Sequence, residues 1–514
     1  MVCGVLGKDA NPKPRTSIDE QTSVISNGQQ LDFWLTDPDA RVLFEQQPSI
    51  LPSNSKSITN TIITINENET YQTIDGFGYT LTGGSAMHLF KLDASTRAQI
   101  LRELFDTNEN HIGVSYLRLS IGASDLDEKV FSYNDLPDGQ TDVNMARFDL
   151  GYDRLYLIPV LKEILAINSQ IKLLGSPWSP PTWMKSNKHS VNGTLETQYY
   201  DAYALYLVRY IKEMRKEGIE IDAITIQNEP LNDHNNPSLS MLAPIQAQFI
   251  KQSLGPAFRQ HSINTKIIIY DHNADHWNYS TSILEDPDAK QYIDGSAFHL
   301  YGGTIDALSY VHDQFPEKNL YFTEQYIGAS GNFKGDLVWH VKNLVVGATR
   351  NWARTVLEWN VAADSNLKPH TPGGCSDCLG ALTIDGNVVR RPRNAAYYII
   401  AHAAKFVRPN STRIGSNMVA GLPNVAFQRP NDKKKVLIVV NDNDSTKQTF
   451  QIQCNDRVYD TSLNGGSVGT YICSREQKRI FPNFKSPKNS ENPKKPKKTK
   501  KPKKIPKSYS SFLL

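Results

Sequence analysis

The feature that most constrains the fold is a series of eight short apolar segments, most of them followed by a longer stretch with helical periodicity. Runs of this kind are typical of strands, and near-continuous apolar character indicates strands covered on both faces. Strand–helix alternation repeated eight times predicts a closed parallel (β/α)8 barrel rather than an open sheet. The expected strands are 73–78, 115–122, 171–178, 222–230, 265–272, 294–301, 319–326 and 354–360.

Two stretches between these strands show the helical pattern clearly. The stretch 150–168 places Leu157, Leu161, Ile164 and Leu165 on one face. Pro159 falls inside this pattern and predicts either a kink or a late start of the helix. The stretch 198–216 has an apolar face made of Tyr203, Leu207, Tyr210, Ile211 and Met214. Both patterns favour amphipathic helices packed against the barrel.

Apolar runs on both sides of the barrel predict a second, all-β domain assembled from the two ends of the chain. Three runs lie between residues 31 and 68, and five lie between 424 and 473. A barrel of this class needs about 250 residues, so a chain of 514 residues has room for both domains. We predict a flexible N-terminus (1–22), N-terminal strands of a β-sandwich (23–70), the barrel (71–391), the C-terminal β-sandwich (392–473) and a disordered basic tail (474–514).

The basic tail dominates the charge balance of the chain. Residues 474–514 hold twelve Lys and two Arg against two Glu, so the formal net charge of +3 hides a negative remainder. The Lys/Pro run from Pro493 to Lys507 has too few apolar side chains to offset the entropy of ordering, which predicts a solvated extension. The alternative is that this tail contacts an anionic surface, either a membrane or a nucleic acid. We expect no nucleic-acid partner for the catalytic domain.

Compartment and crosslinks are only partly constrained by the sequence. No stretch approaches the roughly 18 apolar residues of a membrane-spanning helix, so we expect a soluble or peripheral protein. The first residues, MVCGVLGKDANPKPR, lack the apolar core of a secretory signal, although a start trimmed from a longer precursor would look the same. Cys375 and Cys378 have no second pair to complete a zinc site, which favours a structural role such as a loop disulfide. Cys454 and Cys473 fall on neighbouring expected strands, where a disulfide can form.

Two glutamates at strand ends are the strongest functional signal. In a (β/α)8 barrel, side chains at the C-terminal ends of the strands surround the open mouth. Glu229 follows the apolar run AITIQ and precedes Pro230, and Glu324 ends the run NLYFT. Burying such carboxylates without a partner is costly, and a barrel mouth that uses them would explain their positions. Hydrolysis of a glycosidic bond needs one carboxylic acid and one carboxylate, and a separation of about 5 to 5.5 Å between them would retain anomeric configuration.

Further residues at the strand ends suit the same chemistry. Arg118 and Tyr301 are placed to hydrogen-bond Glu324 and keep it ionised. We expect the negative charge of that neighbour to raise the pKa of Glu229. His272 and His299 are expected either to hydrogen-bond the residues that bind the sugar or to contact the sugar directly.

Aromatic and polar side chains nearby predict a sugar-binding surface. Trp178, Trp183 and Trp359 offer flat faces for the C–H surface of a pyranose ring. Asp125 and Asn228 can bind its hydroxyl groups.

Seven sequence blocks in one order carry a family likeness. They are TIDGFGYTLTGGSA, YLRLSIGASDL, LLGSPWSPPTWMKSN, TIQNEP, AFHLY, YFTEQYIG and LEWN, and they resemble the blocks of glycoside hydrolase family 30 over residues 30–473. The resemblance implies a (β/α)8 barrel with an attached β-sandwich and retaining chemistry, with Glu229 as general acid/base and Glu324 as nucleophile. It also implies no metal or organic cofactor and a secreted or lysosomal location. The substrate-pocket residues implied by position are Arg118, Asp125, Trp178, Asn228, Tyr301 and Trp359.

Two departures from the lysosomal glucosylceramidases of this family bear on the substrate. The segment LKPHTPGGCSDCLGALTIDG resembles microbial members, including endo-β-1,6-glucanases, and the sixth block reads HLY without an intervening Trp. Our working hypothesis is a β-glucosidase of glucosylceramidase type, with an endo-β-1,6-glucanase as the main alternative and an inactive carbohydrate-binding protein as the second. The expected partner is a β-glucoside, either a glycolipid or a β-glucan, and the oligomeric state is not predicted.

Overall fold

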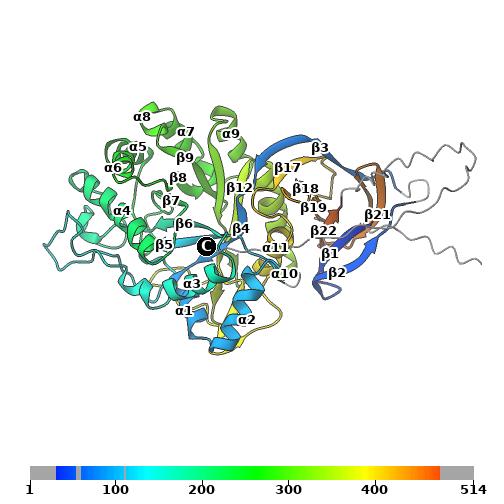
Figure 1. Ribbon diagram of the computed structural model, residues 1–514, viewed down its shortest axis with the longest axis horizontal. Coiled ribbons are helices and arrows are strands. Elements are labelled where there is room, and N and C mark those ends of the chain that lie inside the picture. The colour runs from blue at the N-terminus through cyan, green and yellow to red at the C-terminus, as the bar shows by residue number, and fades with distance from the viewer. Residues whose placement is uncertain (1–29, 54–58, 109–110, 475–514) are drawn as a thin grey trace, which may run out of the picture. The chain divides into compact units, whose positions relative to one another are not determined.

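The computed structural model describes residues 30–53, 59–108 and 111–474. Eight parallel strands form a closed barrel in it (Figure 1). Its strands are β4 (Gly76–Leu81), β5 (Tyr116–Ile121), β6 (Lys172–Pro177), β7 (Ala223–Thr225), β8 (Lys266–Asn273), β9 (Ile293–His299), β10 (Asn319–Glu324) and β12 (Ala353–Asn360). Neighbours in the barrel follow chain order, and β12 closes the ring between β10 and β4. The predicted barrel and each of its eight strands are confirmed. The predicted N-terminus (1–22) and the tail beyond Ser474 lie outside the described residues.

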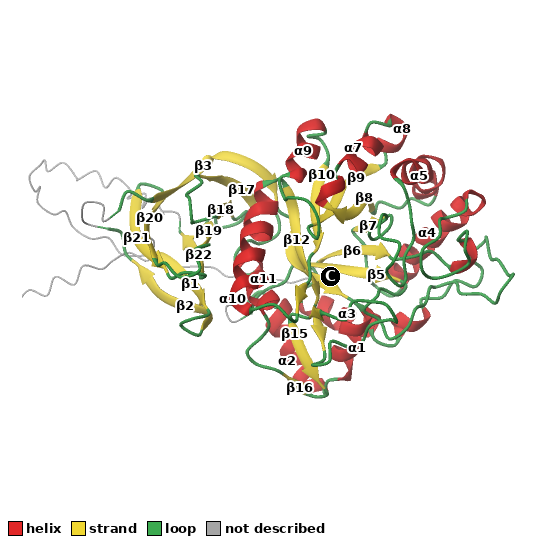
Figure 2. Ribbon diagram, turned by 180° about the vertical axis from the view of Figure 1, so that it is seen from behind, coloured by secondary structure: helices red, strands yellow, loops and turns green. Residues whose placement is uncertain are grey.

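Helices surround the barrel and separate its strands in sequence (Figure 2). They are α1 (Gly83–Lys91), α2 (Ala94–Phe105), α3 (Leu157–Ile167), α4 (Tyr200–Lys216), α5 (Ala243–Phe249), α6 (Gly255–Gln260), α7 (Asn278–Leu284), α8 (Pro287–Lys290), α9 (Ala307–Gln314), α10 (Phe333–His340) and α11 (Ala395–Ala404). Pro159 stands in the first turn of α3, where its missing N–H costs no helical hydrogen bond, so the late start is the correct alternative. Within the described ranges, no helix is long and apolar enough to cross a membrane.

The second domain is a β-sandwich built from both ends of the chain, as predicted. Its strands have the order β2-β1-β22-β19-β18-β17-β3-β20-β21. They are β1 (Leu31–Asp37), β2 (Val42–Ile50), β3 (Ile62–Thr73), β17 (Thr412–Ser416), β18 (Asn424–Gln428), β19 (Lys435–Val440), β20 (Gln448–Cys454), β21 (Arg457–Leu463) and β22 (Val468–Cys473). The short β17 is not predicted, since its sequence TRIGS has one large apolar residue. Cys454 and Cys473 form a disulfide between β20 and β22.

Strand β19 shows why the sandwich and the barrel form one packed body. Leu437 and Val439 belong to the interior of the sandwich, whereas Val436, Ile438 and Val440 belong to the core that continues into the barrel. Alternate residues of a strand point to opposite faces, so the run VLIVV that follows Lys435 is apolar throughout because both faces are covered.

Helix α11 lies in the range that we assign to the sandwich from sequence, but it also packs against the barrel. The Tyr79 hydroxyl of β4 donates to the carbonyl of Ala396 at 3.2 Å. His402 of α11 lies between the hydroxyls of Thr36 and Thr470, 2.8 Å from each, on the sandwich side. We therefore propose that the domain boundary lies after this helix rather than at 391/392.

Two layers of different chemistry fill the inside of the barrel. One residue from each of seven strands forms a buried apolar cluster of Tyr116, Leu174, Ala223, Ile268, Ala297, Tyr321 and Leu357. Inward positions recur every second residue, so the residues two positions further along face the same axis nearer the strand ends. There the buried side chains are polar, and they include Arg118, Ser176, Thr225, His299 and Thr323. This polar layer is the floor of the site described next.

Candidate active site

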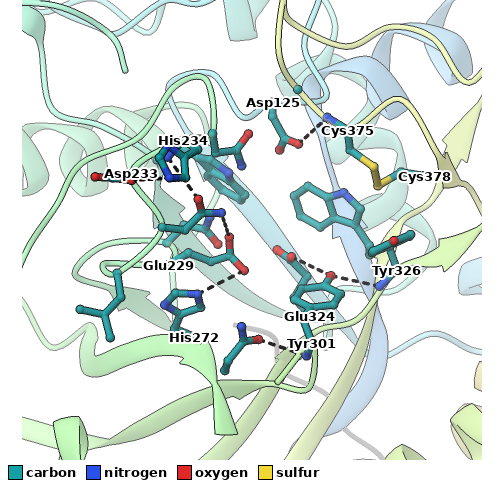
Figure 3. Close-up of a pocket in the computed structure, with 18 of the residues that line it drawn as sticks. Asp125, Glu229, Asp233, His234, His272, Tyr301, Glu324, Tyr326, Cys375 and Cys378 are labelled. Carbon is teal, nitrogen blue, oxygen red and sulfur yellow. Dashed lines mark hydrogen bonds and ion pairs between the residues drawn. A yellow bond between two sulfur atoms is a disulfide. The ribbon is translucent and has the colours of Figure 1, made fainter. Parts of the chain in front are cut away.

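A cavity of about 760 Å³ opens at the C-terminal ends of the barrel strands (Figure 3). The predicted residues that line it are Asp125, Trp178, Asn228, Glu229, His272, Tyr301, Glu324 and Trp359. Arg118 and His299 are fully buried and lie in the polar layer beneath the cavity. The structure thus brings these predicted residues to one end of the barrel.

Glu229 is held by the turn that follows β7. Its φ is +46°, a left-handed conformation that is costly for a non-glycine residue, and its N–H donates to the carbonyl of Asp271 at 3.0 Å. Asn232 Nδ2 donates to Oε2 of Glu229 at 2.7 Å, and Oε1 lies 3.2 Å from Nδ1 of His299. The carboxylate is therefore fixed at both oxygens. Asn232 is a site residue that the sequence analysis missed.

Glu324 is held on the opposite side by two donors. Arg118 Nη1 donates to its Oε2 at 2.5 Å, and the Tyr301 hydroxyl donates to Oε1 at 3.0 Å. One carboxylate oxygen of Glu324 lies within 4.8 Å of one of Glu229. This spacing suits a pair in which one carboxylate attacks the anomeric carbon directly, since such pairs are separated by about 5 to 5.5 Å.

Asp271 anchors Arg118 in the polar layer, and it is not among the predicted site residues. The inward position two residues after Ile268 is Tyr270, yet the structure turns Asp271 inward instead. Tyr270 and Asp271 have φ of 71° and 70°, and the pairing of β8 with β9 shifts register there. Such a bulge reverses the alternation of side chains, so no periodicity in the sequence could place Asp271.

The contacts of Asp271 offset the cost of burying it. Its carboxylate accepts from Arg118 Nη2 at 2.7 Å, from Thr323 Oγ1 at 2.6 Å and from Thr225 Oγ1 at 2.8 Å. Arg118 and Asp271 have no exposed side-chain surface. Buried charges persist only when they are paired and hydrogen-bonded in this way.

The two glutamates and His299 shift one another's pKa values. Glu324, Asp271 and Glu229 outweigh burial and raise the pKa of His299 to about 9. As an imidazolium, His299 donates to Glu229 and to Asp271, at 3.2 Å each. For Glu229, the hydrogen bond and charge of His299 outweigh burial and lower the pKa to about 2. Burial raises the pKa of Glu324 despite the opposing charges of His299 and Arg118.

The expected rise in the pKa of Glu229 is therefore wrong. The expectation considered only the negative charge of Glu324. It omitted the imidazolium of His299, which lies between the two carboxylates and stabilises the ionised form of Glu229.

Two of the three predicted tryptophans lie at the cavity. Trp178 and Trp359 have ring centroids 5.5 Å apart, and the Arg118 guanidinium lies 4.8 Å from the first ring and 5.7 Å from the second. Trp183 does not line the cavity, contrary to expectation. Its Nε1 donates to the carbonyl of Asn134 at 3.0 Å and its ring belongs to the core.

The remaining predicted polar residues differ in their surroundings. Asn228 Oδ1 accepts from Arg118 Nη2 at 2.6 Å. Burial and the charge of Glu324 raise the pKa of Asp125 to about 7. Burial lowers the pKa of His272 to about 4, so this ring is neutral, and its Nε2 lies 3.9 Å from Oε1 of Glu229.

Glu229, His299 and Glu324 also have the donor atoms that could hold a metal ion, one atom from each within 4.8 Å of the others. The sequence predicts no metal there, and this stays a prediction.

Comparisons with known proteins agree with this geometry. Residues 74–407 match the family description "Glycosyl hydrolase family 30 TIM-barrel domain" and residues 410–471 match "Glycosyl hydrolase family 30 beta sandwich domain". The endo-1,6-beta-D-glucanase of Neurospora crassa is 32% identical over 387 residues, covering 72% of this chain and 79% of the relative. The lysosomal acid glucosylceramidase of Mus musculus is 26% identical, covering 81% and 84% respectively.

A solved structure described as an endo-beta1,6-glucanase is 33% identical and superposes with a TM-score of 0.79, covering 87% of this chain and all of that one. Both domains and most of the chain are thus matched by one family. The chain therefore belongs to glycosyl hydrolase family 30 and is a glycoside hydrolase.

Proposed function

We propose that this hydrolase retains anomeric configuration, with Glu324 as nucleophile and Glu229 as general acid/base. Glu324 attacks the anomeric carbon while Glu229 protonates the leaving oxygen, which forms a covalent glycosyl-enzyme. Glu229 then takes a proton from water, which attacks the same carbon and releases the sugar and Glu324. The close spacing of the two carboxylates supports this proposal, because it leaves no room for a water molecule between sugar and nucleophile.

The neighbouring residues take roles that follow from their contacts. Arg118 and Tyr301 stabilise the ionised Glu324 through the hydrogen bonds that they donate to it. Asp125 and Asn228 bind sugar hydroxyls, and Trp178 and Trp359 pack against the C–H face of the ring.

His299 stores the proton that Glu229 needs. Moving one proton along the contact from Nδ1 of His299 to Oε1 of Glu229 converts the resting site into one with a protonated acid and an ionised nucleophile. The competent range of pH therefore lies above the pKa of Glu324 and below that of His299.

The pH profile of kcat/KM is expected to be bell-shaped, with an alkaline limb near pH 9, where His299 loses its proton. The acid limb is expected above the ordinary range of a glutamic acid, because the pKa of Glu324 is raised. In His299→Asn the alkaline limb is expected to move to lower pH, since the group that holds its proton up to about pH 9 is gone and Glu229 must hold the acid proton itself. Initial rates on an aryl β-glucoside between pH 4 and 10 measure this. An unchanged alkaline limb in the variant would exclude His299 as the proton store.

We propose a β-1,6-glucan as the substrate, because the cavity wall beyond the two glutamates is polar. Its residues there are Asn232, Asp233, His234, Asn235, Asn273, Asp275 and His276, with Leu231 as the aliphatic member. The hydroxyl groups of a second sugar can replace their hydrogen bonds to water by hydrogen bonds to this wall. The two hydrocarbon chains of a ceramide would bury little apolar surface against it. Three similar proteins of 31% to 33% identity are endo-1,6-beta-glucanases by name, which supports the same choice. Glucosylceramide, our working hypothesis from sequence, becomes the second candidate.

Parallel assays test the substrate. We expect linear β-1,6-glucan to be hydrolysed with a kcat/KM at least about tenfold above that for glucosylceramide in detergent, since a tenfold ratio needs only about 1.4 kcal/mol of transition-state binding. A β-1,3-glucan of similar length is the matched control and should be a poor substrate. Hydrolysis of glucosylceramide alone would assign the enzyme to the glucosylceramidase type instead.

A secreted or lysosomal location is part of the proposal. Cys375–Cys378 and Cys454–Cys473 both form disulfides, with Cα atoms 5.8 and 6.7 Å apart. Structural disulfides persist mainly in oxidising compartments.

A further inference from the structure

The loop of residues 371–378, here called the Cys375 loop, hydrogen-bonds to the barrel loops that hold the site residues. Thr371 Oγ1 donates to the carbonyl of Asn236, and Asn236 Nδ2 donates to the carbonyl of Pro372, in the loop after β7. At its other end β14 (Cys378–Leu379) pairs with β11 (Ile327–Gly328), three residues after Glu324. The Cys375 loop thus bridges the segments that follow Glu229 and Glu324.

The same loop holds Asp125 by both its main chain and its side chain. Thr371 N–H donates to the carbonyl of Asp125 at 2.8 Å, and Cys375 N–H donates to Oδ2 at 3.1 Å (Figure 3). A side chain on Gly374 would bring its Cβ to 2.5 Å from the carbonyl oxygen of Asp125. Gly374 therefore lies so close to the main chain of Asp125 that a side chain at this position would displace the loop.

The Cys375–Cys378 disulfide closes this loop against the aromatic wall of the cavity. Cys378 is 2% exposed and shares a small cluster with Trp178, Trp359 and Leu126, against which Cys375 also packs. The crosslink therefore fixes the Cys375 N–H that faces Asp125.

We propose that the disulfide-closed Cys375 loop is a positioning element of the sugar site, which fixes the Asp125 carboxylate for a hydroxyl of the bound glucosyl unit. The inference rests on the proposed function, since it assigns Asp125 to sugar binding. The loop acts through Asp125 and makes no catalytic contact of its own. Its effect should therefore fall on substrate affinity and disappear when Asp125 can no longer bind the sugar as a carboxylate.

The chain offers a matched control, because its second disulfide lies in the sandwich. We expect Cys375→Ser/Cys378→Ser to lower kcat/KM for an aryl β-glucoside about tenfold, mainly through KM, as misplacement of a binding group does. Cys454→Ser/Cys473→Ser should stay within about twofold, although it also loses one crosslink. Gly374→Ala, which keeps both disulfides, should reproduce the loss because its new Cβ displaces the loop from Asp125. Thermal unfolding of each variant separates these effects from loss of fold.

A double-mutant cycle tests whether the loop acts through Asp125. Assayed above pH 7, where Asp125 is ionised, Asp125→Asn alone should lower kcat/KM about a hundredfold, as loss of a hydrogen bond to a charged group does. Adding Cys375→Ser/Cys378→Ser to Asp125→Asn should then cause little further loss. Fully additive losses, or a loop variant equal to the sandwich control, would overturn the proposal.

Binding of a glucose-configured iminosugar, measured by calorimetry, separates failure of this inference from failure of the proposed function. An inactive wild type that binds the iminosugar would refute the proposed hydrolysis, while the affinities of the loop variants would still test the loop. An active wild type whose loop variants bind as tightly as the sandwich control would refute the loop alone.

Discussion

Glu324→Gln is expected to lower kcat for a β-glucoside by about 10⁴- to 10⁶-fold, the range found when a hydrolase loses its nucleophile. The amide is too weak a nucleophile to form the glycosyl-enzyme, yet it has the shape of the carboxylate and can still accept from Arg118. Its fold should therefore survive. The measurement is the initial rate, with the melting temperature as the check on folding. In the wild type, a 2-fluoro-glucoside should label the peptide that contains Glu324.

Glu358→Gln is the matched control for this prediction. Glu358 is also a buried glutamate near a strand end, but its carboxylate contacts Nδ1 of His340 at 2.9 Å and does not line the cavity. Its variant should lose stability and keep kcat within about tenfold of wild type, because it leaves both proposed carboxylates in place. A Glu324→Gln enzyme as active as Glu358→Gln would refute the assigned nucleophile.

Glu229→Gln is expected to lower kcat/KM by about 10²- to 10⁴-fold on substrates whose leaving group needs protonation, as loss of a general acid does. On 2,4-dinitrophenyl β-glucoside the loss should be far smaller, since that leaving group departs without a proton. The glycosyl-enzyme should then accumulate, because no base activates water. Added azide should restore turnover and yield the β-glucosyl azide.

The comparison between leaving groups distinguishes loss of acid catalysis from a general defect in binding. A general defect in binding would lower kcat/KM for both substrates equally, and azide would not rescue it. An α-configured azide product would indicate direct displacement and contradict the retaining mechanism.

The sequence by itself determined the architecture and the two glutamates. Eight apolar runs with helices between them leave few folds other than a parallel barrel, because each strand must be covered on both faces. In that fold the ends of all strands meet at one mouth, so Glu229 and Glu324 converge although 95 positions separate them in the chain. The apolar runs along the sequence and the topology of the barrel thus both locate the two glutamates at the barrel mouth.

The tertiary structure decided how those carboxylates are tuned and held. A bulge in β8 breaks the alternation of its side chains and turns Asp271 into the site. Trp183 lies outside the site because its indole N–H donates to Asn134 in the core. The pKa of Glu229 depends on His299, from a different strand, placed within hydrogen-bonding distance. Electrostatic shifts depend on distances between groups that are remote in sequence, and periodicity along one strand carries no information about them.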